Sequence, residues 1–249
     1  MTEARHQVST IAMVMAMRDE AAPVVAALGA VPMEVPKGRV HEWYEARRAG
    51  VRVVIAVNGV EPRHGLDGIG VEPAVMNTSA VLDHVQPDLV VSAGTAGGWA
   101  SRGGTIGALY LAHPHVVRHD RRIPLAGFDR YGIGEFPVLP MRSVASMIGA
   151  VPGVVTTGGS LDESPDDRRM IEASGAVAKD MEAAAVAYVC ELYGVPCAAL
   201  KAITDLHDVP VSSAEQFTAN LAMASERLAD AVVRLIDVIA GRSLDEFDH

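Results

Sequence analysis

The stretch KDMEAAAVAYVCELYGVPCAALKAITDLHD, residues 179–208, contains two patterns that decide the fold. Its first half is an alanine-rich apolar run, which predicts a helix over Met181–Tyr193. Its second half contains a short apolar run, which predicts a strand over Cys197–Ile203. Alternation of a helix with a buried strand is typical of α/β proteins, so the rest of the chain should show the same alternation.

The remaining sequence does alternate in this way. Further strands are predicted over Ile11–Met15, Val51–Val57, Leu89–Ser92, Ala108–Leu111 and Gly153–Thr156. Further helices are predicted over Glu20–Leu28, Ala74–His84, Arg168–Ser174 and Ala214–Ala240. We therefore expect a single α/β domain over residues 1–249 with three layers, in which a central, mostly parallel mixed sheet is flanked by helices. Residues 1–8 and 242–249 are expected to be flexible tails.

Composition restricts the classes of partner. The chain has 249 residues, of which 49% are hydrophobic, and this is enough to bury a large core. Its formal net charge of -10 argues against a basic surface for nucleic acid or for anionic lipid. We therefore expect the protein to bind a small molecule.

The N-terminal sequence and the two cysteines predict a cytoplasmic protein without a membrane segment. MTEARHQVST has no apolar signal-peptide core, and Ile11–Met17 is too short to cross a bilayer. Cys190 and Cys197 lie outside CxxC spacing and cannot form a disulfide framework for a chain of this length. They are expected to be reduced, buried thiols.

Three carboxylates follow predicted strands or begin a predicted helix. Glu20 comes soon after the first strand, Asp205 directly follows Cys197–Ile203, and Glu182 begins a helix. Ligands of such sheets bind beyond the carboxyl ends of the strands. Each residue alone is commonly a helix or turn cap. Together they fit cleavage of an N-glycosidic bond, which needs a proton for the departing base, a base for water and a group that holds the ribose hydroxyls.

The segment VVSAGTAGGWA, residues 90–100, is rich in small residues where a predicted strand ends. Such residues let a ligand approach the backbone closely, although a tight turn is the alternative. The segment does not match GxGxxG, and the chain contains no GxxxxGK[ST] loop. A dinucleotide or P-loop site is therefore not expected.

Several blocks occur in an order that identifies a family resemblance: AMRDE, GTAGG, HDRRIP, FDRYG, TTGGSLD, DMEAAAVAYV and KAITDLHD. Over about residues 9–240 the chain resembles 5′-methylthioadenosine nucleosidases, particularly their plant-type branch, within the nucleoside phosphorylase superfamily. The resemblance implies hydrolysis of a purine nucleoside without a cofactor, in a homodimer. It also implies that Asp205 is the general acid that protonates adenine N7, that Glu20 activates water, and that Glu182 with Met181 binds the ribose.

The resemblance implies further substrate contacts. Leu161 and Asp162 match adenine contacts, partly through backbone atoms. Ile123 and Phe128 match the apolar pocket for the 5′-alkylthio group, which a second subunit often completes. The other matching positions are Thr95, Ala96 and Gly97 beneath the nucleoside and Thr204 and Lys201 beside the acid. The chain departs from its relatives at Gly159, where Asp is frequent, at Lys201, where the bacterial branch has Arg, and over residues 57–70.

Three other functions stay open from the sequence. A phosphorylase would hold phosphate with arginines, and Arg18 keeps that option open, although Glu20 would repel phosphate. A futalosine-type hydrolase would differ on the 5′ side of the pocket. A non-catalytic nucleoside-binding or storage protein would not need all three carboxylates. The histidines His113, His115, His119 and His207 are expected to be structural, because their spacing alone does not indicate a metal site.

Overall fold

The structure is a computed structural model that describes residues 7–247. Its strands are β1 (Thr10–Met15), β2 (Val31–Met33), β3 (Glu42–Arg48), β4 (Val51–Val57), β5 (Val60–Glu61), β6 (Leu66–Asp67), β7 (Leu89–Gly98), β8 (Leu109–Arg118), β9 (Phe136–Pro137), β10 (Val151–Thr157), β11 (Ala178–Asp180) and β12 (Cys197–Leu206). Its helices are α1 (Arg18–Leu28), α2 (Val71–His84), α3 (Phe128–Ile133), α4 (Arg142–Ile148), α5 (Pro165–Ser174), α6 (Ala183–Tyr193) and α7 (Ser213–Ile239). Short 3₁₀ helices cover Ala100–Arg102 and Leu244–Glu246.

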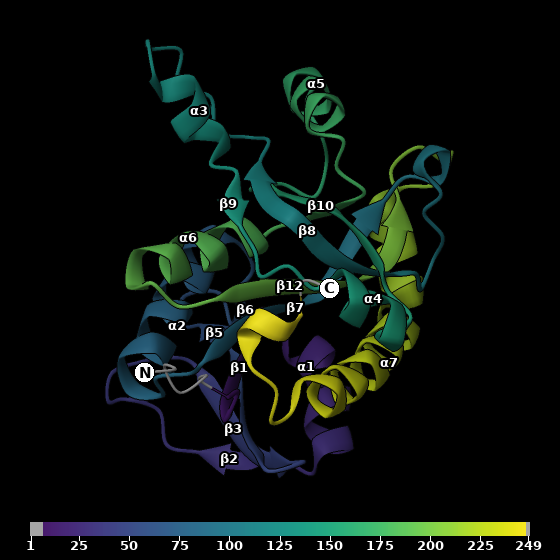
Figure 1. The fold of residues 1–249 in the computed structure, drawn as a ribbon. Helices are drawn as coiled ribbons and strands as arrows, with labels where there is room; N and C mark the ends of the chain where they lie inside the picture. Colours follow the sequence, from purple (N-terminus) through teal and green to yellow (C-terminus); the bar gives the residue numbers. More distant parts are fainter. Residues whose placement is uncertain (1–6, 248–249) are drawn as a thin grey trace.

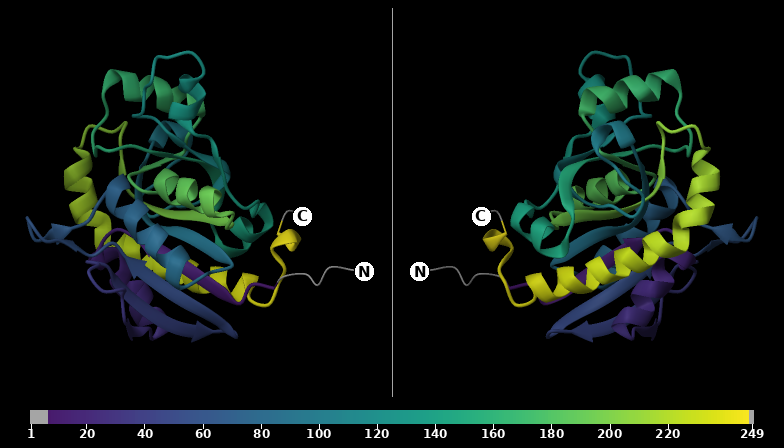
Figure 2. Two further views of the ribbon diagram at one scale, coloured as in Figure 1. Left: turned by 90° about the vertical axis from the view of Figure 1, so that its left-hand side faces the viewer. Right: turned by 90° about the vertical axis from the view of Figure 1, so that its right-hand side faces the viewer.

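The expected α/β fold with a central mixed sheet is confirmed. The main sheet runs in the order β11-β10-β8-β12-β7-β1-β4-β3-β2, with β9 paired to β8, and β5 and β6 form a separate hairpin. Helices α1, α4 and α7 cover one face of the sheet, and α2 and α6 cover the other (Figure 1). The long helix α7 runs along one side of the molecule (Figure 2). Apolar side chains fill both spaces between sheet and helices.

The central pairings of the sheet bring several strand ends together. Strand β1 is parallel to β4 and β7, and β7 is parallel to β12. The carboxyl ends of β1, β7 and β12 therefore lie at one edge. The short strand β11 reaches the same edge because it pairs antiparallel with the end of β7, Lys179 opposite Gly97. Other antiparallel pairs join β3 to β4 and β8 to β12.

Helix α6 has a sequence suited to its position. Its alanines Ala183, Ala184, Ala185 and Ala187 are buried, and their small side chains let the helix lie close to the sheet. The helix ends at Gly194, whose backbone has φ +67° and donates hydrogen bonds to Cys190 and Glu191. Both cysteines are free and buried, as expected.

Several predicted strands ended too early. Strand β7 was predicted to stop at Ser92, but it continues through the glycine-rich segment to Gly98, and β12 continues past Ile203 to Leu206. Strand β8 likewise extends to Arg118. The physical reason is that neighbouring strands supply hydrogen bonds along the whole length, so pairing of Leu206 with Gly98 overrides the weak strand propensity of glycine. Asp205 therefore lies within a strand, at an irregularity of register, rather than after it.

Other elements were not predicted. These are β2, β3, β5, β6, β9 and β11 among the strands and α3 and α4 among the helices. Most are short, and β3 (EWYEARR) carries charged residues because it lies toward one edge of the sheet. Local pattern is weak evidence for such segments, since their pairing partners are far away in sequence.

The predicted flexible tails need correction. Gln7 bridges to Ser243, and Val8 and Phe247 are buried, with Phe247 completely inaccessible. The end of the described chain is therefore packed, because Phe247 joins the apolar cluster beneath α4 and α7. Residues 1–6 and 248–249 of the predicted tails lie outside the described residues.

Candidate active site

A cavity of about 350 Å³ lies where the carboxyl ends of β1, β7 and β12 meet β11. Its volume falls within the range typical of small-molecule sites, about 300–1,000 Å³. The residues that line it are Ala16, Met17, Glu20, Ile69, Thr95, Ala96, Gly97, Leu161, Lys179, Asp180, Met181, Glu182, Thr204, Asp205 and Phe217. The three predicted carboxylates thus reach one cavity from three separate elements.

Glu20 is held at the cavity wall by the segment that follows β7. It lies in the first turn of α1 and is 4% exposed. Its Oε1 accepts hydrogen bonds from the backbone N–H of Thr95 at 2.8 Å and from the Thr95 hydroxyl. Its carboxyl also lies against Gly94, where an added Cβ would meet Oε2 at 3.4 Å. The end of β7 therefore holds this carboxylate through the backbone and hydroxyl of Thr95.

Glu182 is the N-cap residue of α6 rather than part of the helix, and it is partly buried. Its Oε1 accepts a hydrogen bond of 2.8 Å from the backbone N–H of Gly70. Burial and the neighbouring Asp180 carboxylate raise the pKa of Glu182 to about 7, although Lys201 opposes this effect. The protonated form of Glu182 is therefore favoured more than that of an ordinary glutamate.

A buried ion pair lies beneath Glu182. Nζ of Lys201 is 2.8 Å from Oδ2 of Asp180, and both side chains are almost inaccessible. Burial opposes the charge of Lys201, but the Asp180, Glu182 and Glu20 carboxylates together raise its pKa. Asp180 also accepts hydrogen bonds from the Thr157 hydroxyl at 2.6 Å and from the Ala183 backbone at 2.8 Å. The pair fixes the start of α6 and brings a positive charge close to the carboxylates.

Asp205 is 1% exposed and lies on β12. Its Oδ1 accepts a hydrogen bond of 2.9 Å from the Thr204 hydroxyl. Its Oδ2 is buried and has no hydrogen-bond partner among the described residues. A buried carboxyl oxygen without a partner is costly unless a ligand supplies one, so this atom suits a role in binding or proton transfer.

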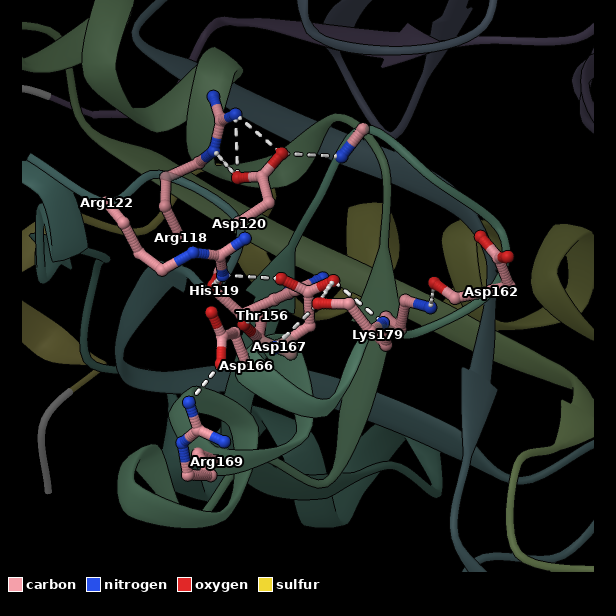
Figure 3. A network of polar contacts seen from close by, with 12 residues as sticks. Arg118, His119, Asp120, Arg122, Thr156, Asp162, Asp166, Asp167, Arg169 and Lys179 are labelled. Carbon is pink, nitrogen blue, oxygen red and sulfur yellow. Dashed lines mark hydrogen bonds and ion pairs between the residues drawn. The ribbon is translucent and has the colours of Figure 1, made fainter.

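Lys179 fixes the segment before α5. Its Nζ donates hydrogen bonds to the backbone oxygens of Leu161 at 2.9 Å and Asp162 at 2.8 Å, as the contact with Asp162 in Figure 3 illustrates. Burial lowers the pKa of Lys179, and nearby carboxylates, Glu163 first, oppose this effect. Leu161 lines the cavity, so Lys179 determines where this wall lies.

A second set of contacts supports the same segment from the end of β8 (Figure 3). Arg118 makes two hydrogen bonds to the Asp120 carboxylate, which in turn accepts one of 2.7 Å from the backbone N–H of Gly159. His119 is 2% exposed and hydrogen-bonds to Thr156. The end of β8 and the residues after it therefore pack against β10 and the loop before α5.

The protein is similar to known nucleosidases over nearly its whole length. A model of the family described as "Phosphorylase superfamily" matches residues 10–237. The chain is 36% identical to a 5′-methylthioadenosine nucleosidase of Arabidopsis thaliana, with 98% of this chain and 92% of the relative covered. It is 34% identical to a 5′-methylthioadenosine/S-adenosylhomocysteine nucleosidase of the same plant, with 97% and 96% covered.

A solved structure agrees with these relatives. The structure of Arabidopsis thaliana 5′-methylthioadenosine nucleosidase in apo form matches with a TM-score of 0.94 and 35% identity, and it covers 98% of this chain and all of that one. The chain belongs to the 5′-methylthioadenosine nucleosidase family of the phosphorylase superfamily. The resemblance inferred from the sequence blocks is thereby confirmed.

Most of the predicted site residues of this nucleosidase lie at the cavity, but four do not. Lys201 lies behind the cavity wall and acts on it through Asp180. Asp162 is exposed and contributes its backbone oxygen to Lys179. Ile123 and Phe128 lie outside the cavity, in the segment around α3, where Phe128 is 48% exposed. The single chain thus brings neither of these two to the site.

The sequence analysis did not predict several of the residues that line the cavity. They are Ala16, Met17, Ile69, Lys179, Asp180 and Phe217. Asp180 and Lys179 precede the matched Met181 and Glu182, and a charged residue just before an apolar helix is a signal that could have been used. Phe217 has no such signal, because only the fold brings the start of α7 to the cavity.

Two further findings concern metals and membranes. Within residues 7–247, the structure contains no group of three or more His, Cys, Asp or Glu side chains placed to hold a metal ion. Among the helices of the same residues, none is both long and apolar enough to cross a membrane. Two of the histidines contact other side chains: His119 is hydrogen-bonded to Thr156, and His207 lies beside Asp205.

Proposed function

We propose that the protein hydrolyses the N-glycosidic bond of 5′-methylthioadenosine, or of a closely related 5′-thioadenosine such as S-adenosylhomocysteine, and releases adenine. The observation that carries this proposal is the meeting of Glu20, Glu182 and Asp205 at one cavity, each in a different electrostatic setting. The activities for which the two Arabidopsis relatives are named support the same reaction.

Each carboxylate suits one step of the reaction. Asp205, whose Oδ2 has no hydrogen-bond partner within residues 7–247, protonates N7 of the departing adenine. Glu20, whose Oε1 is held by Thr95, accepts a proton from the attacking water. Glu182 binds the ribose hydroxyls and stabilises the positive charge that develops on the sugar. Leu161, Thr95, Ala96, Gly97, Thr204 and Met181 form the walls around the nucleoside.

The phosphorylase alternative finds little support at the cavity. Arg18, the arginine that kept this option open, is 49% exposed in its side chain and pairs with Asp67 at 2.7 Å. No arginine is among the residues described as lining the cavity, where Lys179 is the cation. Phosphate would also lie beside Glu20 and Asp205, so water is the nucleophile that fits.

The pocket for the 5′ group of the substrate needs residues from a second subunit. Ile123 and Phe128 do not reach the cavity of their own chain. We infer a homodimer in which the segment around α3 reaches the partner's site and covers the 5′-alkylthio group. The cytoplasmic location of the protein remains a prediction. The extent of the single domain over residues 1–249 also remains a prediction.

Product analysis tests the proposed function. Purified protein in phosphate-free buffer should release free adenine from 5′-methylthioadenosine, as measured by chromatography, because the nucleophile is water. S-adenosylhomocysteine, futalosine and inosine serve as comparison substrates. Strict dependence on phosphate with a sugar 1-phosphate product would contradict the proposal, and so would a preference for futalosine. Tight binding of nucleoside without turnover would indicate a binding protein.

A further inference from the structure

His207 lies beside the proposed general acid. It is the first residue after the end of β12 and follows Asp205 by two positions. Nε2 of His207 is 3.8 Å from Oδ2 of Asp205. Both atoms are buried, and neither has a hydrogen-bond partner among the described residues. Two unsatisfied polar atoms that face each other at this distance can form a hydrogen bond after a small movement.

Gly97 provides the space for this contact. A Cβ atom at Gly97 would lie 2.2 Å from Nε2 of His207 and 3.0 Å from Oδ2 of Asp205. Any other residue at this position would therefore displace the histidine ring. The Trp99 ring also contacts the His207 ring, with a distance of 5.4 Å between the two centroids.

The second ring nitrogen of His207 lies near two polar groups, and a lysine lies close to one of them. Nδ1 of His207 is 3.1 Å from the Ser213 hydroxyl of α7 and 3.6 Å from Oε1 of Glu163. Nζ of Lys179, on β11, is 3.8 Å from that same Glu163 oxygen. Asp208 completes the charged groups that act on the ring. Burial and then Lys179 lower the pKa of His207, while Glu163, Asp205 and Asp208 oppose this effect.

We propose that His207 is a positioning residue for the general acid: it holds the Asp205 carboxyl in place and passes to it the proton that adenine N7 receives. This inference rests on the proposed nucleosidase function. A ring that lies between carboxylates can take up a proton, and a buried ring beside a lysine releases it readily. The side chain of His207 is 8% exposed, so solvent can restore the proton.

The proton balance of the step is complete. The imidazolium of His207 gives its Nε2 proton to Asp205 and becomes neutral. Asp205 gives the proton to N7 as the bond between C1′ and N9 breaks, and the electron pair of that bond stays with adenine. Water adds its hydroxyl to C1′ and gives its proton to Glu20. Glu20 then releases one proton to solvent, and His207 takes one up.

The pair should therefore titrate as a unit. With His207 present, the pair keeps one proton up to the pH at which the imidazolium ionises. Without it, the Asp205 carboxyl must hold the proton alone. Replacement of His207 should shift the alkaline limb of the kcat profile for 5′-methylthioadenosine to lower pH.

The test compares two substrates in the His207→Gln variant, since glutamine can donate a hydrogen bond but cannot carry the proton. For 5′-methylthioadenosine at neutral pH, kcat should fall about tenfold, which is less than the roughly 10²–10⁴-fold that general acid help supplies, because Asp205 itself is still present. For a nitrophenyl riboside, whose leaving group needs no proton, kcat should stay within about twofold of wild type. KM should change little for either substrate. Equal losses on both substrates would overturn the proposal, because a purely structural role would impair both.

Two controls make the comparison specific. His41 is a buried histidine outside this cavity, and the His41→Gln variant should keep the wild-type ratio of the two substrates. In the Asp205→Asn background, His207→Gln should cause no further loss, because the residue acts through Asp205. Independent, multiplicative losses in the double variant would contradict the proposed route of the proton.

An NMR titration tests the contact without relying on activity. Protein with ¹⁵N-labelled histidine should show a lower pKa for His207 in Asp205→Asn than in wild type, because the variant removes a carboxylate that favours the imidazolium. An unchanged pKa would overturn the contact. A wild-type protein without nucleosidase activity would instead overturn the proposed function and the proton transfer with it, while this titration would still decide whether the two side chains interact.

Discussion

At the scale of single residues, the site combines like charges that would repel one another in isolation. Glu20, Glu182 and Asp180 act on one buried cation, Lys201, which is 2.8 Å from Asp180. Removal of one partner of a buried pair leaves an uncompensated charge, so such pairs matter chiefly for the arrangement that they maintain. Here that arrangement fixes the N-cap of α6 and hence the position of Glu182.

Amide replacements should separate the roles of acid and base. Both Asp205→Asn and Glu20→Gln should lower kcat for 5′-methylthioadenosine by about 10²–10⁴-fold with little change in ground-state binding. A nitrophenyl riboside should restore much of the rate of Asp205→Asn but not that of Glu20→Gln, because only the acid becomes unnecessary. Steady-state kinetics on both substrates measure this. If the activated substrate rescued Glu20→Gln instead, the assignment would be reversed.

Glu182 should make the ligand-free protein less stable as pH rises. Its pKa is raised to about 7 in the folded state, so between its ordinary value and that pH the folded protein binds more protons than the unfolded chain. Stability therefore falls as pH rises through this window. The Glu182→Gln variant lacks this effect and should be more stable than wild type above pH 7 by about 1–2 kcal/mol, or a few degrees in Tm.

Thermal unfolding at pH 5 and pH 8 measures this difference. The gain of Glu182→Gln over wild type should be larger at pH 8. Glu191→Gln, which changes an exposed carboxylate on the same helix, is the matched control and should show the same small difference at both pH values. An equal gain for Glu182→Gln at both values would show that the charge of Glu182 is not the cause.

At the scale of elements, the segment around α3 presents apolar side chains to solvent. Leu125 is 62% exposed, Phe128 48% and Tyr131 49%, and the rings of Phe128 and Tyr131 lie 6.0 Å apart. Figure 1 shows α3 at the end of an arm that extends from the sheet. An exposed apolar group of this kind commonly marks an interaction surface.

This arm should be needed for the proposed homodimer. The Phe128→Glu variant should shift the protein toward monomer in light scattering over a range of concentrations. It should also raise KM for 5′-methylthioadenosine more than it lowers kcat, because in the proposed dimer this segment covers the 5′ group of the partner's substrate. Met147→Glu, at an apolar position of α4 that is 59% exposed, is the control and should leave the dimer intact. A fully active wild-type monomer at assay concentration would contradict the prediction.

Elements also show how far the sequence could predict this fold. The strands β1 and β4 and the helices α6 and α7 were predicted nearly within their bounds, because their apolar patterns are long and continuous. Strand β11 could not be predicted, since its three residues pair with the distant ends of β7 and β10. For the same reason Lys179 and Asp180 were not predicted as site residues. Glu20 was predicted, because it follows a strand with a strong apolar pattern.

At the scale of the whole molecule, the sheet explains why residues far apart in sequence reach one cavity. Glu20 and Asp205 follow or end strands that lie on either side of β7, and the parallel pairing makes them neighbours. The family match covers residues 10–237, which includes all of these strands. In the proposed homodimer the partner's α3 segment completes the 5′ pocket, and sequence patterns within one chain carry little information about such a contact.

The two ends of the described chain lie side by side, since Gln7 bridges to Ser243 and Val8 donates a hydrogen bond of 3.0 Å to Arg242. The protein is therefore suited to circular permutation. A short linker could join residues 247 and 7, and new termini could be opened at the exposed turn of Ala49 and Gly50, where Ala49 has φ +49°. Opening this turn would relieve the strained left-handed backbone conformation of Ala49. Every strand around the cavity would keep its neighbours, so connectivity could be changed independently of the site.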